Sequence, residues 1–401
     1  MNREPAYGVG LAYRIMFHDD IMRCRNDIDF LELPTVEYLE RMRRIAADPL
    51  GKCIQQARKT FPCVGHGISM SIGSVGEPET DLLMQTRDFM DQYQINEFSD
   101  HLTFHRMGDK DLSVFMSMPF DRASADWIAS QYNRSKEILG GSFGLEIVTY
   151  PFVVPGSELT EVEFVNRVAE KTDCWLLLDV ANLFYNSSNH GYDPIEFLDQ
   201  IDGDRVQHLH VAGGHQDDDQ WIDSHNEPVH EEVFELLEAV MEKTAARAIT
   251  LERDEEPEHF SSIVDDLRRT KDIFLKYRPE TIPDDLLRNG PPTFEPLVEA
   301  ELIELDALPD DIEGLRRYQE ALVECSFALA DGNFHNRAPE DVLDDYQMTS
   351  AWQSRWKDMR WNVFKKLSYQ VRSVQEFDEQ AAHYSKIAEL HYWANKRAGF
   401  M

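Results

Sequence analysis

Residues 143–213 contain three apolar segments of strand length, which read FGLEIVTY (143–150), CWLLLDVANL (174–183) and VQHLHVAG (206–213). The segments between them are amphipathic and begin with two helix-start signals, Thr160-x-x-Glu163 and Asp193-Pro194-x-Glu196. A strand, a helix and a second strand in succession are typical of a parallel β-sheet. This stretch therefore predicts two consecutive βαβ units.

The same alternation continues on both sides of this stretch and gives eight strands. The other five predicted strands are residues 7–13, 27–34, 64–73, 97–104 and 247–254. Eight βα units in about 275 residues match the size of a (β/α)8 barrel. A doubly wound sheet would more often have fewer strands and a glycine-rich phosphate loop after the first one. We therefore predict an α/β fold in which residues 1–278 form a TIM barrel.

The remainder of the chain has a different pattern. Five prolines between residues 279 and 296 predict a linker over 279–296, because such a stretch cannot sustain a helix. Residues 297–401 show helical periodicity without clear strands, which predicts a C-terminal all-α domain. Its last part carries Trp352, Trp356 and Trp361 among basic residues. We expect this face to pack on the acidic barrel, and a peptide-binding surface is the alternative.

The composition excludes several classes of protein. Hydrophobic residues make up 42% of the 401 residues, which excludes general disorder. A formal charge of −34 counts against nucleic acid as a partner. No apolar stretch approaches the roughly 18 residues of a membrane span, and the amino terminus lacks the pattern of a signal peptide. Five widely spaced cysteines without a C-x-x-C pair encode neither a disulfide framework nor a cysteine zinc site. We expect a soluble, cytoplasmic protein that binds no membrane.

A carboxylate or an imidazole lies near the carboxyl end of seven of the eight predicted strands. In strand order these residues are Glu32, His66, His101, Glu146, Asp179, His210 and Glu252. The reacting groups of TIM barrels lie at that end, so we expect the seven side chains to converge on one mouth. Burying so many ionisable groups without compensation costs several kcal/mol for each charge, and a metal cluster would remove that cost.

The types of these side chains limit which metal ions could bind. Histidine and carboxylate ligands without cysteine suit iron, manganese or zinc. The candidates outnumber the roughly four to six ligands of one ion, so two or three ions are implied. The loops add Asn182, Asp223 and His225, with His190 and His215 as further candidates. No nucleophile elbow, P-loop or dinucleotide fingerprint is present, and the residues alone leave hydrolase, isomerase and oxidase open.

These residues lie in longer strings that resemble one family. The strings are DFLE (29–32), HGISMSIGS (66–74), SDHLTF (99–104), LLLDVANLFYNSSNHGYDP (176–194), HLHVAGGH (208–215) and WIDSH (221–225). Over about residues 6–275 the chain resembles the multinuclear non-heme iron-dependent oxidative enzymes (MNIO), the family that includes the methanobactin biosynthesis iron oxidase. The resemblance implies a xylose-isomerase-like barrel that holds two or three irons in mixed Fe²⁺ and Fe³⁺ states. It also implies dioxygen as co-substrate, and a cysteine, asparagine or aspartate of a ribosomally made precursor peptide as the target.

The resemblance also implies a ligand set. Carried over motif by motif, the metal ligands are His66, His101, Glu146, Asp179, Asn182, His210, Asp223, His225 and Glu252. Glu146 would be a bridging carboxylate, and Glu146, Asp179 and His210 would form the catalytic set. Arg253 stands where many members have an aromatic residue after the strand-eight glutamate.

The expected partners follow from the same resemblance. The first is a precursor peptide, and family enzymes usually need a separate protein that recognises the leader of that peptide. The C-terminal segment would replace this protein, brace a homodimer, or do neither. Two alternatives remain at this point: a divalent-metal sugar isomerase or hydrolase of the same barrel class, and a non-catalytic metal- or peptide-binding module.

Overall fold

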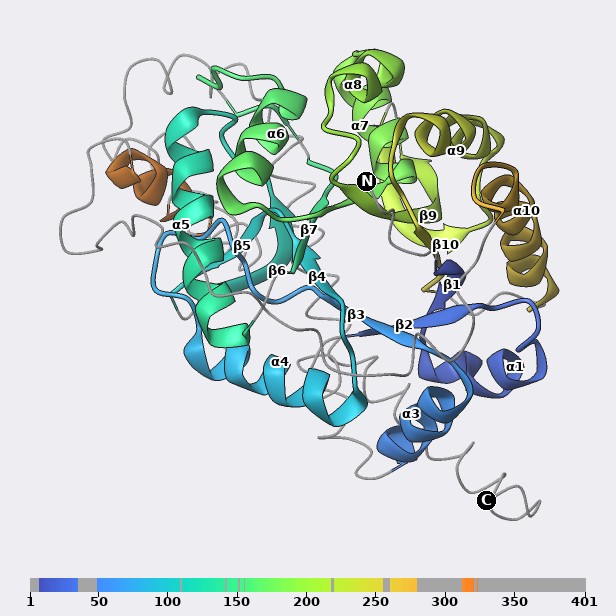
Figure 1. Cartoon of the computed structure of the whole chain (residues 1–401). Coiled ribbons are helices and arrows are strands. Elements are labelled where there is room, and N and C mark those ends of the chain that lie inside the picture. The colour runs from blue at the N-terminus through green and yellow to red at the C-terminus, as the bar shows by residue number, and fades with distance from the viewer. Residues whose placement is uncertain are drawn as a thin grey trace, which may run out of the picture.

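The computed structural model describes residues 7–34, 49–108, 110–140, 143–150, 152–154, 156–217, 220–254, 260–279, 312–320 and 323. Eight parallel strands form a closed barrel within this part of the chain (Figure 1). They are β1 (Gly8–Ala12), β2 (Phe30–Pro34), β3 (Cys63–Gly67), β4 (Phe98–His101), β7 (Gly144–Ile147), β8 (Leu176–Asp179), β9 (Val206–Asp217) and β11 (Ala248–Glu252). Each lies within or overlaps one of the eight predicted strands, so the predicted TIM barrel is confirmed.

The strands are joined in chain order around the barrel. β1 pairs with β2 on one side and with β11 on the other, and β8 pairs with β9 to complete the closure. The register places Asp179 beside His210, and His101 beside Glu146. Residues at equivalent heights on neighbouring strands therefore carry the ionisable groups that the sequence analysis selected.

Helices form an outer ring around these strands (Figure 1). They are α1 (His18–Arg23), α3 (Pro49–Thr60), α4 (Thr80–Tyr93), α5 (Arg122–Leu139), α6 (Glu161–Thr172), α7 (Val180–His190), α8 (Pro194–Gln200), α9 (Glu231–Lys243) and α10 (Ser261–Tyr277), with a 3-10 turn η1 (Ile15–Phe17). Strand residues such as Leu11, Leu178 and Leu251 are fully buried. Parallel strands that are covered on both faces read as apolar runs for this reason.

Both predicted helix-start signals are confirmed. The Thr160 hydroxyl accepts the Glu163 backbone N–H, and the Glu163 side chain accepts the Thr160 N–H at 2.8 Å. The Asp193 carboxylate accepts the Ile195 N–H at 2.8 Å at the start of α8. Each cap satisfies backbone donors that have no partner inside the helix.

The sequence analysis was wrong at the end of β8 and missed three strands. The apolar run 174–183 predicts one strand, but β8 ends at Asp179 because its carboxylate caps α7. The strands β5 (Phe104–Met107) and β6 (Lys110–Met116) form an antiparallel hairpin after β4. The strand β10 (Gln220–Glu227) pairs antiparallel with the long strand β9. The two hairpins extend the chain beyond the minimal barrel.

A helix from the region after the predicted linker contacts the barrel. Residues 312–320 are helical and appear in orange in Figure 1. The Gln319 side chain accepts the Val75 N–H at 2.7 Å and donates to the Gly73 carbonyl at 2.6 Å. The Tyr318 hydroxyl donates to the Ser117 carbonyl at 2.8 Å. The linker from residue 280 onward and the tryptophan-containing tail lie outside the described residues.

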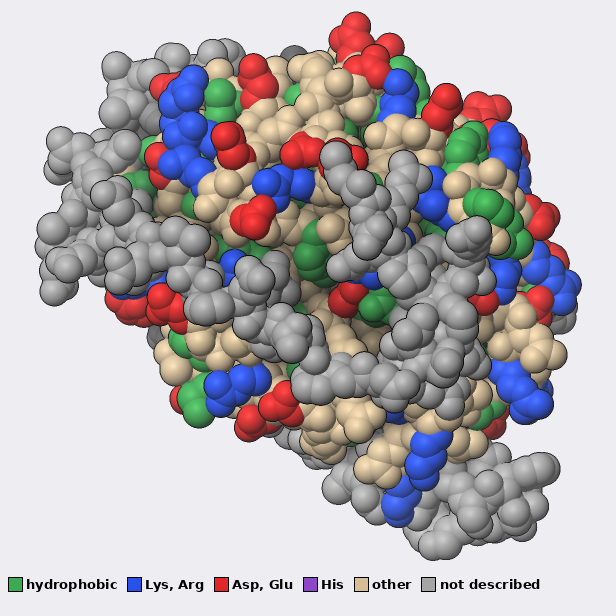
Figure 2. Space-filling model, viewed as in Figure 1, with side chains coloured by type: hydrophobic (Ala, Val, Ile, Leu, Met, Phe, Trp, Pro, Cys, Tyr) green, Lys and Arg blue, Asp and Glu red, His purple; other side chains and the backbone are tan. Residues whose placement is uncertain are grey.

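The described surface mixes both signs of charge. On the face seen in Figure 2, acidic and basic side chains are interspersed rather than gathered into one field. Some of them form ion pairs, such as Arg205 with Asp173 at 2.9 Å and Lys171 with Asp126 at 3.0 Å. Among the described helices, none has both the length and the hydrophobicity that a membrane span requires.

Candidate metal centre

The carboxyl ends of the barrel strands bring the predicted ligands together. Glu146 on β7 is the central group, and its Oε2 atom lies 3.1 Å from both His66 Nε2 and His101 Nε2. Its Oε1 atom lies 3.8 Å from His210 Nδ1 on β9. The four side chains are almost completely buried. One carboxylate therefore contacts imidazoles from three different strands.

A second group of predicted ligands adjoins the first through His210. The Nδ1 atom of His210 lies 3.0 Å from Glu252 Oε2, and that carboxylate oxygen lies 3.8 Å from His225 Nε2. His225 Nε2 also lies 2.8 Å from Asp223 Oδ1. Asp223 and His225 reach the mouth because β10 folds back along β9. Potential ligand atoms of Asp179, Asp223 and His225 lie within 4.8 Å of one another.

In each of the four histidines of the centre, one ring nitrogen contacts a partner on the outer side of the site. His66 Nδ1 lies 2.8 Å from Ser99 Oγ, and His101 Nδ1 lies 2.8 Å from the Gly67 carbonyl. The remaining two imidazoles have carboxylate partners, Glu32 for His210 Nε2 at 2.9 Å and Asp254 for His225 Nδ1 at 3.2 Å. In metal sites such outer partners fix the ring orientation and leave the other nitrogen for the ion.

Several inward atoms are buried without a hydrogen-bond partner. Among the described residues, fourteen buried side-chain nitrogen and oxygen atoms make no hydrogen bond, and six of them belong to predicted ligands: Glu146 Oε2, Asp179 Oδ2, Asn182 Oδ1, His210 Nδ1, Asp223 Oδ1 and His225 Nε2. Close approaches among these six, such as Asp223 Oδ1 to His225 Nε2 at 2.8 Å, lack hydrogen-bond geometry. Buried polar atoms normally find partners, so such a concentration needs an explanation. Each of these six atoms is a nitrogen or oxygen atom of a type that binds metal ions. The side chains present therefore fit a multinuclear metal centre.

The close packing of ionisable groups at the centre also shifts their pKa values. Burial raises the pKa of Asp179 to about 8, and the neighbouring Asp223 charge adds to the effect. Burial alone would lower the pKa of His210, but the carboxylates of Glu252, Glu32 and Glu146 raise it well above its ordinary value. Burial and mutual repulsion therefore make uncompensated carboxylate charge costly here, and bound cations would remove that cost.

Comparison with known proteins now decides the family. The profile of the RiPP precursor modification enzymes MbnB/TglH/ChrH matches residues 8–274. The chain belongs to this family. RiPPs are peptides that are synthesised by the ribosome and then modified, so family membership supports an enzyme whose substrate is a precursor peptide.

Individual relatives span the same region. A UPF0276 protein from Acinetobacter baylyi is 33% identical over 248 residues, which cover 62% of this chain and 84% of that protein. A UPF0276 protein from Shewanella oneidensis is 31% identical over 255 residues, which cover 63% of this chain and 88% of that protein. The solved structure of a zinc-bound IOLI protein is 13% identical with a TM-score of 0.45, over 67% of this chain and 99% of that one.

Two further histidines that the sequence analysis proposed lie elsewhere in this MbnB/TglH/ChrH barrel. The His190 ring stacks on the Tyr150 ring, with centroids 4.2 Å apart, and its Nε2 faces the Tyr150 carbonyl at 3.0 Å. The His215 side chain is exposed, and its Nδ1 lies 2.9 Å from Ser224 Oγ. Neither contributes to the four groups of ligand atoms that lie close together in the described structure.

Sequence reasoning missed two residues beside the ligands. Asp254 follows β11 and contacts His225, and Arg14 contacts Asp254 through Nη2 at 2.6 Å. Arg14 also lies 3.9 Å from Glu252. Arg14 and Asp254 stand 240 positions apart in the sequence. They could be found only by knowing that β1 and β11 are neighbours in the barrel. Arg253 is buried and pairs with Asp266 at 2.9 Å.

A further buried carboxylate, that of Glu161, lies outside the centre. Glu161 begins α6 and accepts hydrogen bonds from the Tyr150 hydroxyl at 3.0 Å, the Tyr192 hydroxyl at 2.8 Å and the Asn186 amide at 3.2 Å. Burial raises its pKa to about 7 although all three hydrogen bonds act in the opposite direction. The barrel therefore favours the protonated form of this carboxyl group.

Stability should depend on pH through Glu161. Because its pKa is higher in the folded chain, its stabilising contribution is complete below about pH 4.5 and is lost as the pH rises through about 7. We expect Glu161→Gln to remove this dependence. The difference in unfolding free energy between wild type and variant should change by roughly 3 kcal/mol across that range. Denaturant titrations at several pH values measure it, and parallel profiles for the two proteins would contradict the assignment.

Proposed function

We propose that this chain is an iron-dependent oxidase that uses dioxygen to modify a cysteine, asparagine or aspartate residue of a precursor peptide. Family membership supports the peptide substrate. The observation that carries the metal proposal is the set of buried nitrogen and oxygen atoms that make no hydrogen bond at the mouth, from Glu146 on β7 to His225 on β10. Their types suit iron, and no described cysteine belongs to the groups of candidate ligands.

The nine proposed ligands divide between the two halves of the mouth. His66, His101 and Glu146 would hold metal on one side, and Asp223, His225 and Glu252 on the other. His210 adjoins both, being near Glu146 and Glu252. Asp179 caps α7 with Oδ1, which leaves Oδ2 for the centre, and Asn182 presents its Oδ1 one helical turn later.

The chemistry follows from this arrangement. When bound here, iron would supply the reduction of dioxygen and the removal of hydrogen from the peptide side chain. The protein supplies fixed ligand directions, because the outer partners Ser99 and Glu32 hold the rings of His66 and His210. Both Asp179 and His210 have no exposed surface, so bulk water is excluded from the base of the centre. Water exclusion strengthens the electrostatic interactions of the site and limits side reactions.

Metal analysis tests this proposal. Protein produced in iron-rich medium should contain two or three irons per chain, and mass spectrometry should detect an oxidative mass change in a precursor peptide encoded beside its gene. The His190→Ala variant is the control, since this imidazole lies outside the centre, and it should retain the iron. Zinc or manganese in place of iron, with an unmodified peptide, would instead support a sugar isomerase, a hydrolase or a non-catalytic binding module.

A further inference from the structure

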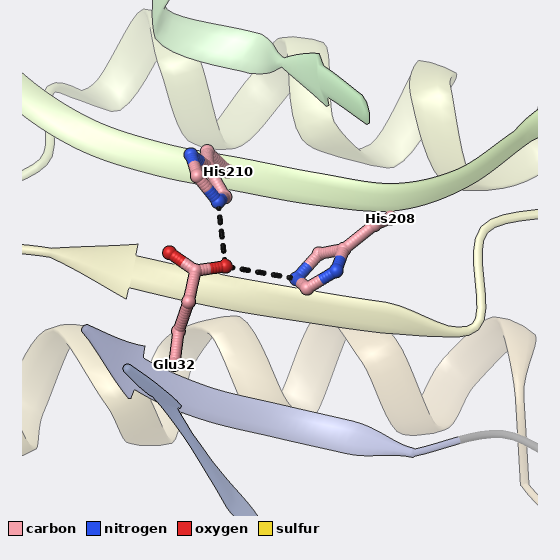
Figure 3. Close-up of side chains that lie close together, drawn as sticks. All are labelled: Glu32, His208 and His210. Carbon is pink, nitrogen blue, oxygen red and sulfur yellow. Dashed lines mark hydrogen bonds and ion pairs between the residues drawn. The ribbon is translucent and has the colours of Figure 1, made fainter. Parts of the chain in front are cut away.

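Beneath the metal centre, the barrel interior contains a second cluster of ionisable groups. It consists of Glu32 on β2 with His208 and His210 on β9 (Figure 3). Glu32 Oε2 lies 2.9 Å from His210 Nε2 and 3.7 Å from His208 Nε2. All three residues are at most 2% exposed. By distance alone this cluster could hold a further ion.

The hydrogen bonds of the cluster argue against an ion. Thr250 on β11 lies between Glu32 and His208, and its hydroxyl donates to Glu32 Oε2 at 3.1 Å. The same hydroxyl oxygen lies 2.8 Å from His208 Nε2. None of the side-chain atoms of Glu32, His208 and Thr250 is among the unpartnered buried atoms of the described structure, in contrast to the ligands above them. The cluster is therefore complete without a cation.

These contacts determine which atom donates and which atom accepts in each hydrogen bond. A threonine hydroxyl has one hydrogen, and here it points to the carboxylate, so its oxygen must accept from His208 Nε2–H. Glu32 Oε2 thus receives two hydrogen bonds, one from Thr250 and one from His210 Nε2–H. With its Nε2 committed as a donor, His210 has only Nδ1 to offer to the centre, and Nδ1 is the atom near Glu146 and Glu252.

From this geometry we infer that Glu32 is a positioning residue, and that the chain His208–Thr250–Glu32 fixes the ring and the tautomer of His210 for metal binding through Nδ1. The inference rests on the proposed metal centre. It assigns to Glu32 a role outside the ligand set, although Glu32 lies at a strand end like the ligands. Metal-binding histidines commonly have such a carboxylate partner on the second nitrogen.

Zinc titration of the full-length chain tests the inference without iron or dioxygen chemistry. We compare wild type with Glu32→Gln, Glu32→Ala and Thr250→Val. Glu32→Ala should weaken zinc binding roughly 10- to 100-fold with an unchanged number of ions, which is the usual cost of losing such a partner. Glu32→Gln should recover part of the affinity because an amide oxygen still accepts the His210 N–H. Thr250→Val keeps the side-chain shape and should have the smallest effect.

Nitrogen-15 histidine NMR adds a readout that does not depend on activity. The Nε2–H proton of His210 should be protected in wild type and in Thr250→Val, and lost in Glu32→Ala. Loss of one zinc ion in Glu32→Gln with normal affinity for the rest would make the cluster a metal site and overturn the inference. An unchanged affinity and an unchanged proton resonance in Glu32→Ala would also overturn it. If wild type binds no zinc, the metal centre itself is contradicted, and the proton resonance still decides the role of Glu32.

Discussion

The Glu146→Gln variant should lose its iron and its ability to modify the peptide, while its barrel remains folded. Glu146 contacts His66, His101 and His210, so one substitution weakens ligation on three strands at once. Glutamine has the same shape as glutamate but lacks its charge, so no core volume is removed. We expect less than one iron per chain, and a fall in peptide conversion of at least roughly 100-fold.

Iron analysis, circular dichroism and peptide mass spectrometry together measure this effect. His66→Ala should act in the same direction because it removes another proposed metal ligand, whose Nε2 atom lies 3.1 Å from Glu146 Oε2. Glu161→Gln is the matched control, since Glu161 is also a buried glutamate but contacts Tyr150, Tyr192 and Asn186 instead of the centre. Full iron occupancy in Glu146→Gln would remove Glu146 from the ligand set.

The eight barrel strands could be predicted because each is an apolar run between amphipathic helices. The convergence of Glu146, Asp179 and His210 could be predicted for a related reason. In a closed parallel barrel all strands point the same way, so residues at their carboxyl ends meet wherever they stand in the sequence. The convergence does not depend on which strand lies opposite which, so it could be predicted before any contact was known.

The outer partners of the histidines could not be predicted in this way. Ser99 is one of many serines, and only the register of β3 with β4 shows that it lies beside His66. The contact between Glu32 and His210 crosses the barrel over 178 positions of sequence. The sequence analysis treated Glu32 as one more strand-end carboxylate, and pattern alone could not separate a ligand from a residue that orients one.

Local signals also compete at the boundaries of elements. The run LLLDVANL is apolar enough for one strand, but the Asp179 carboxylate accepts the N–H groups of Ala181 and Asn182 and starts a helix. The predicted strand 206–213 was too short, because β9 continues to Asp217 and pairs with β10. In both places a contact that the local pattern does not contain, a helix cap in one and strand pairing in the other, sets the boundary.

Removal of residues 297–401 should give protein that aggregates or contains little iron. The helix at 312–320 covers part of the barrel, where Tyr318 packs near the buried Phe104 with ring centroids 6.1 Å apart. Gln319 makes two hydrogen bonds to the segment that follows β3. That segment follows directly after Gly67, the last residue of β3, whose carbonyl lies 2.8 Å from His101 Nδ1. Loss of the helix would therefore expose apolar surface and loosen a loop that supports the centre.

The Gln319→Ala substitution should separate the loss of iron from the exposure of apolar surface. Gln319→Ala leaves the Val75 N–H and the Gly73 carbonyl without this partner, which should cost roughly 1–3 kcal/mol for each buried group that stays unpaired. It should lower the iron content without aggregation, because the apolar contacts of Tyr318 remain. Size-exclusion chromatography and iron analysis compare the truncated chain, Gln319→Ala and wild type. A truncated chain that stays monodisperse and keeps its iron, but no longer binds its peptide, would show that the C-terminal segment captures substrate instead of supporting the barrel.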